Sequence, residues 1–161
     1  PKFVEVIKQL YDIGRLFEGM TDFNAVARAF RKIVPIELSY THLDDDPTPV
    51  YADIRETAIC LATRGKAGNG DFEALQNGVT FIRPFMYRGH YYIEDAILDG
   101  AKAAYLATAI EKGIETLQLY NPLESIPELR PSVTNKINKL KNFQPEAFFY
   151  WVQTSMLLDG E

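Results

Sequence analysis

Apolar residues recur at intervals of three or four along most of this chain, the spacing of a helix that buries one face. Seven runs follow that spacing: residues 3–17, 23–34, 50–61, 72–82, 91–119, 133–140 and 146–158. No stretch alternates apolar and polar residues over a useful length, so no β-strand is expected. The pattern predicts an all-α fold with about seven helices.

Prolines and capping residues mark where these helices should begin and end. Thr21 is expected to cap the second helix, and Thr48, with the proline that follows it, to open the third. Asp71 can cap the fourth helix. Pro84 should end that helix, because a proline ring clashes with the carbonyl group four residues earlier. Pro145 should start the last one.

The longest run, residues 91–119, cannot be one straight surface helix, because its charged residues change faces. Glu94, Asp95, Asp99 and Lys102 share one face, and the acidic residues of that face are expected to be solvated. The charged residues at 111–115 lie on a face rotated well away from it. Either the helix breaks near Gly113, or its middle is buried on all sides. Burial is favoured by small residues that let a neighbouring backbone approach closely: Ala96, Gly100, Ala103, Ala104 and Ala107.

The net charge of the chain is −5, but basic residues gather locally. The second predicted helix places Arg28, Arg31 and Lys32 on one face, and the sixth adds Lys136 and Lys139. These residues are either the solvated side that any surface helix needs or a docking patch for phosphate-bearing partners, lipid headgroups or nucleic acid. Because the chain as a whole is acidic, affinity for a membrane must come from such a local patch.

Residues suited to catalysis or metal binding are few. With one cysteine, Cys60, and two histidines, the chain offers no thiolate zinc site and no plausible nucleophilic triad. The glycines of residues 64–70 could form a phosphate nest, but the stretch lacks the lysine–serine ending of a P-loop and is expected only to connect two helices. Arg83 and His90 allow one enzymatic alternative. It is a helical RNA-processing nuclease in which His90 transfers protons and Arg83 holds the phosphate.

Four consecutive rings characterise the last predicted helix: Phe148, Phe149, Tyr150 and Trp151. At about 100° per residue they cannot all point into one small core. At least one ring must face another helix of the chain or lie at the surface, where it would anchor self-association. The apolar stretch 148–152 is far too short to span a bilayer, and no secretory signal opens the chain. A reducing, cytosolic or nuclear environment is expected.

Four stretches, in this order, resemble the N-terminal helical region of orthomyxovirus (influenza-like) matrix proteins. They are LFEGMTDFNAVARAFRKIVPIELS (16–39), RGKAGNGD (64–71), GHYYIEDAILDGAKAAYLATAIEKG (89–113) and PEAFFYWVQTSMLLD (145–159). The second helix resembles the family's in its threonine–aspartate start and proline end, and the long central helix in its small residues and closing glycine. Together the stretches span nearly the whole chain.

The resemblance implies two small helical bundles packed as one compact unit, residues 1–63 and 71–161, joined by a glycine-rich connection at 64–70. It implies a non-catalytic viral matrix protein that needs no cofactor, polymerises beneath the envelope through open head-to-tail contacts, and links membrane to ribonucleoprotein. The partners would be other copies of the chain, the anionic inner membrane leaflet and the viral ribonucleoprotein, with envelope glycoprotein tails as further candidates. The protein would lie in the virion, beneath the envelope, and in the host cytoplasm and nucleus, peripheral at the membrane.

Two departures from the family pattern point to a divergent genus. The family's basic segment for nuclear import and RNA contact falls on residues 83–88, where only Arg83 and Arg88 are basic. The family's cysteine–histidine cluster would fall near the last helix, which offers Trp151, Thr154 and Met156 instead, so no zinc is implied. The family protein also continues into a further helical domain, so this chain is expected to be a piece of a longer one. A generic cytosolic helical interaction domain is the other alternative.

Overall fold

The computed structural model describes residues 2–33, 48–86 and 90–161. Within these residues the chain is all-α, which confirms the predicted fold class of about seven helices. The α-helices are α1 (Lys2–Glu18), α2 (Phe23–Ile33), α4 (Thr48–Ala62), α5 (Phe72–Ile82), α6 (Ile93–Glu111), α7 (Leu140–Phe143) and α8 (Pro145–Leu158). Two short 3₁₀ helices, η1 (Arg83–Phe85) and η2 (Asn135–Lys139), lead out of α5 and into α7.

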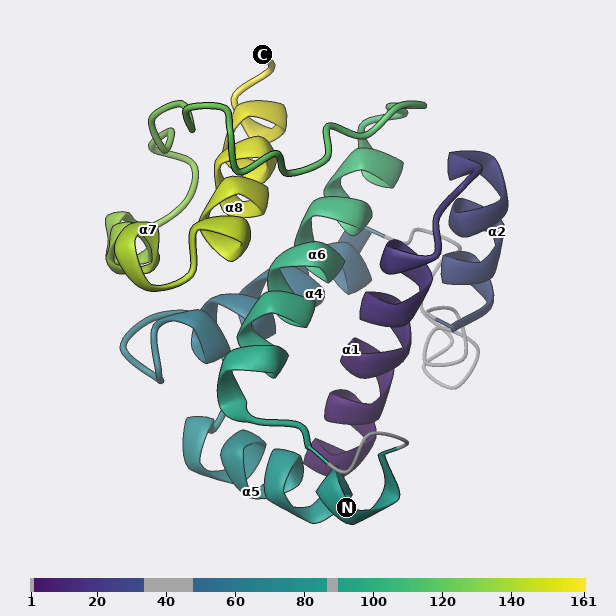
Figure 1. The fold of residues 1–161 in the computed structure, drawn as a ribbon, viewed down its shortest axis with the longest axis vertical. Coiled ribbons are helices and arrows are strands. Elements are labelled where there is room, and N and C mark those ends of the chain that lie inside the picture. The colour runs from purple at the N-terminus through teal and green to yellow at the C-terminus, as the bar shows by residue number, and fades with distance from the viewer. Residues whose placement is uncertain (1, 34–47, 87–89) are drawn as a thin grey trace.

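Helix α6 is the centre of the fold. Figure 1 shows it running through the middle of the molecule, with α1 on one side, α8 on the other and α4 behind. Its most extensive contacts are with these three helices, and every residue from 99 to 110 is buried. The prediction that the middle of this run is buried on all sides is therefore confirmed.

Small residues make that burial possible. A Cβ atom added to Gly100 would lie 3.3 Å from the Cβ atom of Ala58, so α4 and α6 approach each other closely at this point. The helix then stops before Gly113, whose φ of 69° suits a residue without a side chain. The two alternatives for residues 91–119 are both present, since the helix is buried along its middle and also ends near Gly113.

The helix ends follow the capping residues and prolines, with one correction. The Asp71 carboxylate accepts a hydrogen bond from the backbone N–H of Ala74, as predicted. Helix α5 ends at Ile82, directly before Arg83, which agrees with the predicted effect of Pro84. Helix α8 begins at Pro145. The prediction that Thr21 caps α2 was wrong, because Asp22 stands directly before the helix and accepts from the N–H of Asn24 at 2.9 Å.

The glycine-rich connection at 64–70 folds back onto α4. Gly68 has a φ of 76°, and a Cβ atom there would lie 2.4 Å from the carbonyl oxygen of Glu56. The helices before and after this loop contribute to one hydrophobic core, since α6 contacts α1 and α4 as well as α8. Residues 1–63 and residues 71–161 thus share one hydrophobic core.

The linker segment, residues 114–134, crosses the bundle without helical structure and is held by buried hydroxyl groups. The Tyr105 hydroxyl accepts from the backbone N–H of Gln118 at 2.8 Å, and the Tyr150 hydroxyl accepts from Tyr120 at 3.3 Å. The Ser155 hydroxyl accepts from the N–H of Arg130 at 3.0 Å. The predicted sixth helix is reduced to η2 and α7, which pack against α8.

Gly14 provides a test of the packing between α1 and α6. A Cβ atom added there would lie 2.0 Å from Oδ1 of Asp99, so Gly14→Ala must displace the buried Asp99 carboxylate from its partners. Disrupting a buried charge network costs about 3 kcal/mol or more. We expect urea denaturation to show a loss of that order in the free energy of unfolding.

Gly19→Ala is the matched control for this substitution. At Gly19 the nearest atom to an added Cβ is the Arg15 carbonyl oxygen at 3.6 Å, an ordinary contact. The free energy of unfolding should then change by about 0.5 kcal/mol or less. Equal stabilities of the two variants would contradict the close approach of α1 and α6.

Candidate functional site

The five basic residues predicted as a docking patch do not lie together. Arg28, Arg31 and Lys32 are exposed on α2, and Lys136 and Lys139 are exposed on η2. Figure 1 shows α2 at the right of the molecule and α7, which directly follows η2, at the left. The structure therefore provides two basic surfaces on opposite sides of the molecule.

The surface at η2 gains a third lysine from the glycine-rich loop. Lys136 Nζ donates a hydrogen bond to the backbone oxygen of Lys66 at 2.8 Å. Contact with Lys66, together with the positive charges of Lys66 and Lys136, lowers the pKa of Lys139. We call Lys66, Lys136 and Lys139 the lysine cluster; all three are exposed to solvent.

A pocket of about 550 Å³ lies at the lysine cluster, between the start of α6, the end of α4 and helix α7. Its lining also includes Arg64, Glu94, Phe143 and Gln144. Arg64 pairs with Glu94, the only carboxylate in the lining, at 3.5 Å. The pocket therefore presents four cations against one carboxylate. Its chemistry is that of an anion-binding site.

Lys66 was not predicted from the sequence, although the glycine-rich loop that carries it was a candidate site. The loop was considered as a phosphate nest built from backbone amides. In the structure the loop contributes to a basic site in two ways: the Lys66 backbone oxygen accepts from Lys136, 70 residues away along the chain, and the Lys66 side chain contacts Lys139. Only the tertiary fold brings these residues together.

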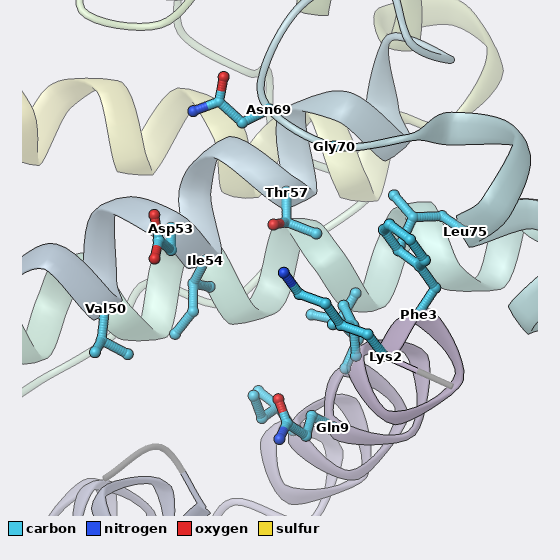
Figure 2. Close-up of a pocket in the computed structure, with 13 residues that line it drawn as sticks. Lys2, Phe3, Gln9, Val50, Asp53, Ile54, Thr57, Asn69, Gly70 and Leu75 are labelled. Atoms are coloured by element: carbon cyan, nitrogen blue, oxygen red, sulfur yellow. The ribbon is translucent and has the colours of Figure 1, made fainter. Parts of the chain in front are cut away.

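A second pocket, of about 350 Å³, lies between α1 and α4 (Figure 2). Its lining is mostly apolar, with Phe3, Leu10 and Ile54 among the residues that form it. Lys2 and Asp53 are the charged residues of this lining, which contains no histidine or cysteine. The pocket can accommodate an apolar group beside the polar side chains of Asp53 and Thr57.

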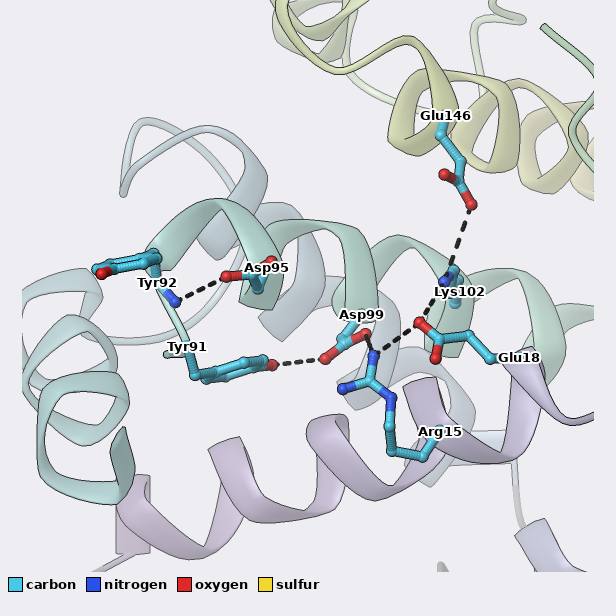
Figure 3. A network of polar contacts seen from close by, with 8 residues as sticks. All are labelled: Arg15, Glu18, Tyr91, Tyr92, Asp95, Asp99, Lys102 and Glu146. Carbon is cyan, nitrogen blue, oxygen red and sulfur yellow. Dashed lines mark hydrogen bonds and ion pairs between the residues drawn. The ribbon is translucent and has the colours of Figure 1, made fainter. Parts of the chain in front are cut away.

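A network of charges lies where α1, α6 and α8 meet (Figure 3). Asp99, 1% exposed, accepts a hydrogen bond from the Tyr91 hydroxyl at 2.6 Å and pairs with Arg15 at 3.0 Å. Lys102, 3% exposed, lies 3.4 Å from a carboxylate oxygen of Glu18 and 3.8 Å from one of Glu146. The prediction of a solvated acidic face was wrong for Asp99, which is covered and, like Lys102, buried.

Burial dominates the electrostatics of this network. It raises the pKa of Asp99 to about 7, although the Tyr91 hydroxyl and the charges of Arg15 and Lys102 lower it. Burial, followed by the charge of Asp99, raises the pKa of Tyr91, so Tyr91 remains protonated and acts as the hydrogen-bond donor. Neither of the two pockets described above has Asp99 or Tyr91 in its lining. We assign the network a structural role in joining α1, α6 and α8.

Arg83, one residue of the nuclease alternative, is held against the segment that leads into α6. Arg83 Nε donates to the backbone oxygen of Tyr91 at 2.8 Å, and its guanidinium lies 4.6 Å from the centre of the Tyr92 ring. These contacts occupy Arg83 in fastening η1 to the start of α6. His90 is exposed, and Arg88, the other basic position of that segment, lies outside the described residues.

The aromatic residues of α8 lie mainly in the core. Phe148, Tyr150 and Trp151 are buried, so the expectation that they anchor self-association is corrected for these three. The Tyr150 ring stacks on Tyr105 at 5.8 Å between centroids, and Phe149, partly buried, packs against Tyr120 at the same distance. The rings can face in different directions because α6 covers one side of α8 and the linker segment covers another.

Metal and thiol chemistry find little support in the described part of the chain. No group of three histidine, cysteine, aspartate or glutamate side chains there could hold a metal ion. Burial raises the pKa of the Cys60 thiol, which makes it a poor nucleophile. None of the helices described is both long and apolar enough to span a bilayer.

The raised pKa of Asp99 predicts a dependence of stability on pH. Its ordinary value is 3.8, so between about pH 4 and pH 7 the folded protein holds a proton that the unfolded chain releases. The stability that Asp99 contributes is full below about pH 4 and is lost as the pH rises through about 7. The free energy of unfolding, relative to Asp99→Asn, should fall by on the order of 4 kcal/mol across this range.

Denaturant titrations of the unmodified protein and of Asp99→Asn between pH 4 and pH 8 measure this difference. The contributions of the other titrating groups to the free energy of unfolding largely cancel in it. A difference that stays constant with pH would mean that Asp99 remains ionised in the folded protein.

Compared with known protein families, curated proteins and solved structures, the chain matches none of them.

Proposed function

We propose that this chain is a non-catalytic, matrix-type protein that docks on an anionic membrane and links it to a second anionic partner, the ribonucleoprotein. The observation that carries the proposal is the lysine cluster, which sits beside the exposed ring of Phe143. The resemblance of four stretches to orthomyxovirus matrix proteins supports the same function. No cofactor or chemical step enters the proposal.

The lysine cluster and Phe143 have the composition of an interfacial anchor. The three lysines can contact lipid phosphates, and Phe143, 84% exposed, can enter the headgroup region beside them. Each base close to an anionic surface contributes about 1 kcal/mol. Three lysines therefore contribute about 3 kcal/mol to reversible docking of a chain whose net charge is −5, and the Phe143 ring adds to this.

The second basic surface supports the linking role. Arg28, Arg31 and Lys32 lie on α2, across the molecule from α7 (Figure 1). A membrane that approaches the molecule from the side of α7 leaves the side of α2 free. The α2 surface is then available for the phosphates of a ribonucleoprotein.

Vesicle sedimentation tests membrane docking. Replacing Lys66, Lys136 and Lys139 by alanine should weaken binding to phosphatidylserine vesicles by about 3 kcal/mol, roughly a hundredfold, at low salt. Binding of the unmodified protein should fall steeply as salt is added, because the contacts are electrostatic.

The matched control replaces Arg28, Arg31 and Lys32 by alanine, which removes the same number of charges from the other side of the molecule. We expect this variant to keep most of its vesicle binding. Equal losses in both variants would indicate net charge alone, and no loss in either would contradict electrostatic docking.

We further propose that the chain self-associates, as a matrix-type protein would, and this requires an exposed apolar surface other than the α8 rings, three of which are buried. The rings of Phe81 and Phe85, 56% and 74% exposed, lie 6.2 Å apart at the end of α5. An exposed aromatic pair can anchor a contact with an unlike surface of a second copy, which would build an open polymer.

Phe85→Ser should weaken self-association by about 2 kcal/mol, roughly thirtyfold, in sedimentation velocity experiments over a range of concentrations. Phe143→Ser, which also removes an exposed ring, should leave self-association intact and weaken vesicle binding instead. A protein that stays monomeric at all concentrations, at low and at neutral pH, would argue strongly against the matrix assignment.

A further inference from the structure

The pocket at the lysine cluster contains a buried hydrogen-bond acceptor without a partner. The Gln144 side chain donates from Nε2 to the backbone oxygen of Glu94 at 3.1 Å, which orients its amide group. Oε1 of the same amide is buried and accepts no hydrogen bond in the described structure. Buried polar atoms are usually paired, so an unpaired acceptor on a residue of the pocket lining points to a ligand that donates there, which Oε1 can reach once the Gln144 amide turns toward the pocket.

The rest of the pocket offers donors of positive charge. Lys66, Lys136 and Lys139 are close enough that their charges affect one another, since Lys66 and Lys136 lower the pKa of Lys139. The only carboxylate in the lining, Glu94, is already paired with Arg64. A ligand that fits both features carries concentrated negative charge and, a short distance away, a hydrogen-bond donor.

We propose that this pocket binds a phosphorylated polyol of the inositol phosphate type, with a phosphate monoester on the lysine cluster and a ring hydroxyl donating to Oε1 of Gln144. In a membrane, this group is the headgroup of a phosphoinositide. The inference rests on the membrane docking proposed above and specifies which lipid the site selects.

Three properties of the pocket favour this class over phosphatidylserine. A phosphate monoester is nearly dianionic at neutral pH and matches three adjacent ammonium groups, whereas the phosphatidylserine headgroup brings an ammonium group of its own. A polyol ring supplies the hydroxyl donor that Gln144 lacks. The pocket volume of about 550 Å³ lies within the range of small-molecule sites, so it can admit a phosphorylated ring.

Vesicles matched in total surface charge distinguish selective recognition from general attraction. The full chain should bind phosphatidylcholine vesicles containing phosphatidylinositol bisphosphate more tightly than vesicles containing phosphatidylserine. Soluble inositol trisphosphate should compete for the former. Gln144→Leu, which leaves the charge unchanged, should lower binding to the phosphoinositide vesicles and to inositol trisphosphate by about fivefold, the effect of one hydrogen bond, and spare phosphatidylserine binding.

Lys139→Ala provides a second variant in case Gln144→Leu fails to fold, since Lys139 is exposed. Its binding to inositol trisphosphate should fall by about fivefold, while Arg31→Ala, also exposed, should bind unchanged. Thermal melting of each variant establishes that it is folded.

The outcomes separate the two proposals. Equal binding to both kinds of vesicle, without competition by inositol trisphosphate, would overturn the pocket assignment and leave membrane docking standing. Binding of soluble inositol trisphosphate without vesicle binding would support the pocket and overturn the docking function. Binding of neither would overturn both.

Discussion

The fold depends on enclosing one helix completely. Because α6 has no solvent-exposed side along residues 99–110, each of its neighbours must fit a surface that is fixed in shape and in charge. Gly100 lets α4 come close, and Gly14 leaves room on α1 for the Asp99 carboxylate. The charges of Asp99 and Lys102 then require partners, which α1 and α8 supply as Arg15, Glu18 and Glu146. A buried charge left without a partner is strongly destabilising, so these contacts fix how the three helices meet.

Much of the fold could be predicted from the sequence, because helix ends depend on local chemistry. Helix ends are set by contacts with backbone atoms within a few residues, as at Asp71, Pro84 and Pro145. The small residues of α6 indicate a helix that its neighbours approach closely. The burial of Asp99 could not be predicted in this way. Its spacing with Glu94 and Asp95 is that of a solvated face, and only the partners on α1 and the hydroxyl of Tyr91 make its burial possible.

The candidate site was predictable only in part for the same reason. Lys136 and Lys139 stood out because their segment has bases and no acid, but Lys66 and Gln144 join them through the tertiary fold. The α8 rings misled because four consecutive aromatic residues resemble a contact surface. In the structure, α6 and the linker segment surround that helix, which leaves exposed rings at the end of α5 and beside the lysine cluster.

The contact between Lys136 and the backbone of Lys66 links the mechanics of the fold to its surface chemistry. It joins the C-terminal third of the chain to the loop after α4, across a cluster of like charges that repel one another. An anion bound there would neutralise that repulsion and would bind only when both segments are in place, so occupancy and local stability are thermodynamically coupled. A membrane that supplies the anion would consequently stabilise this contact. It would hold η2 and α7 against the bundle most firmly in the molecules that are docked.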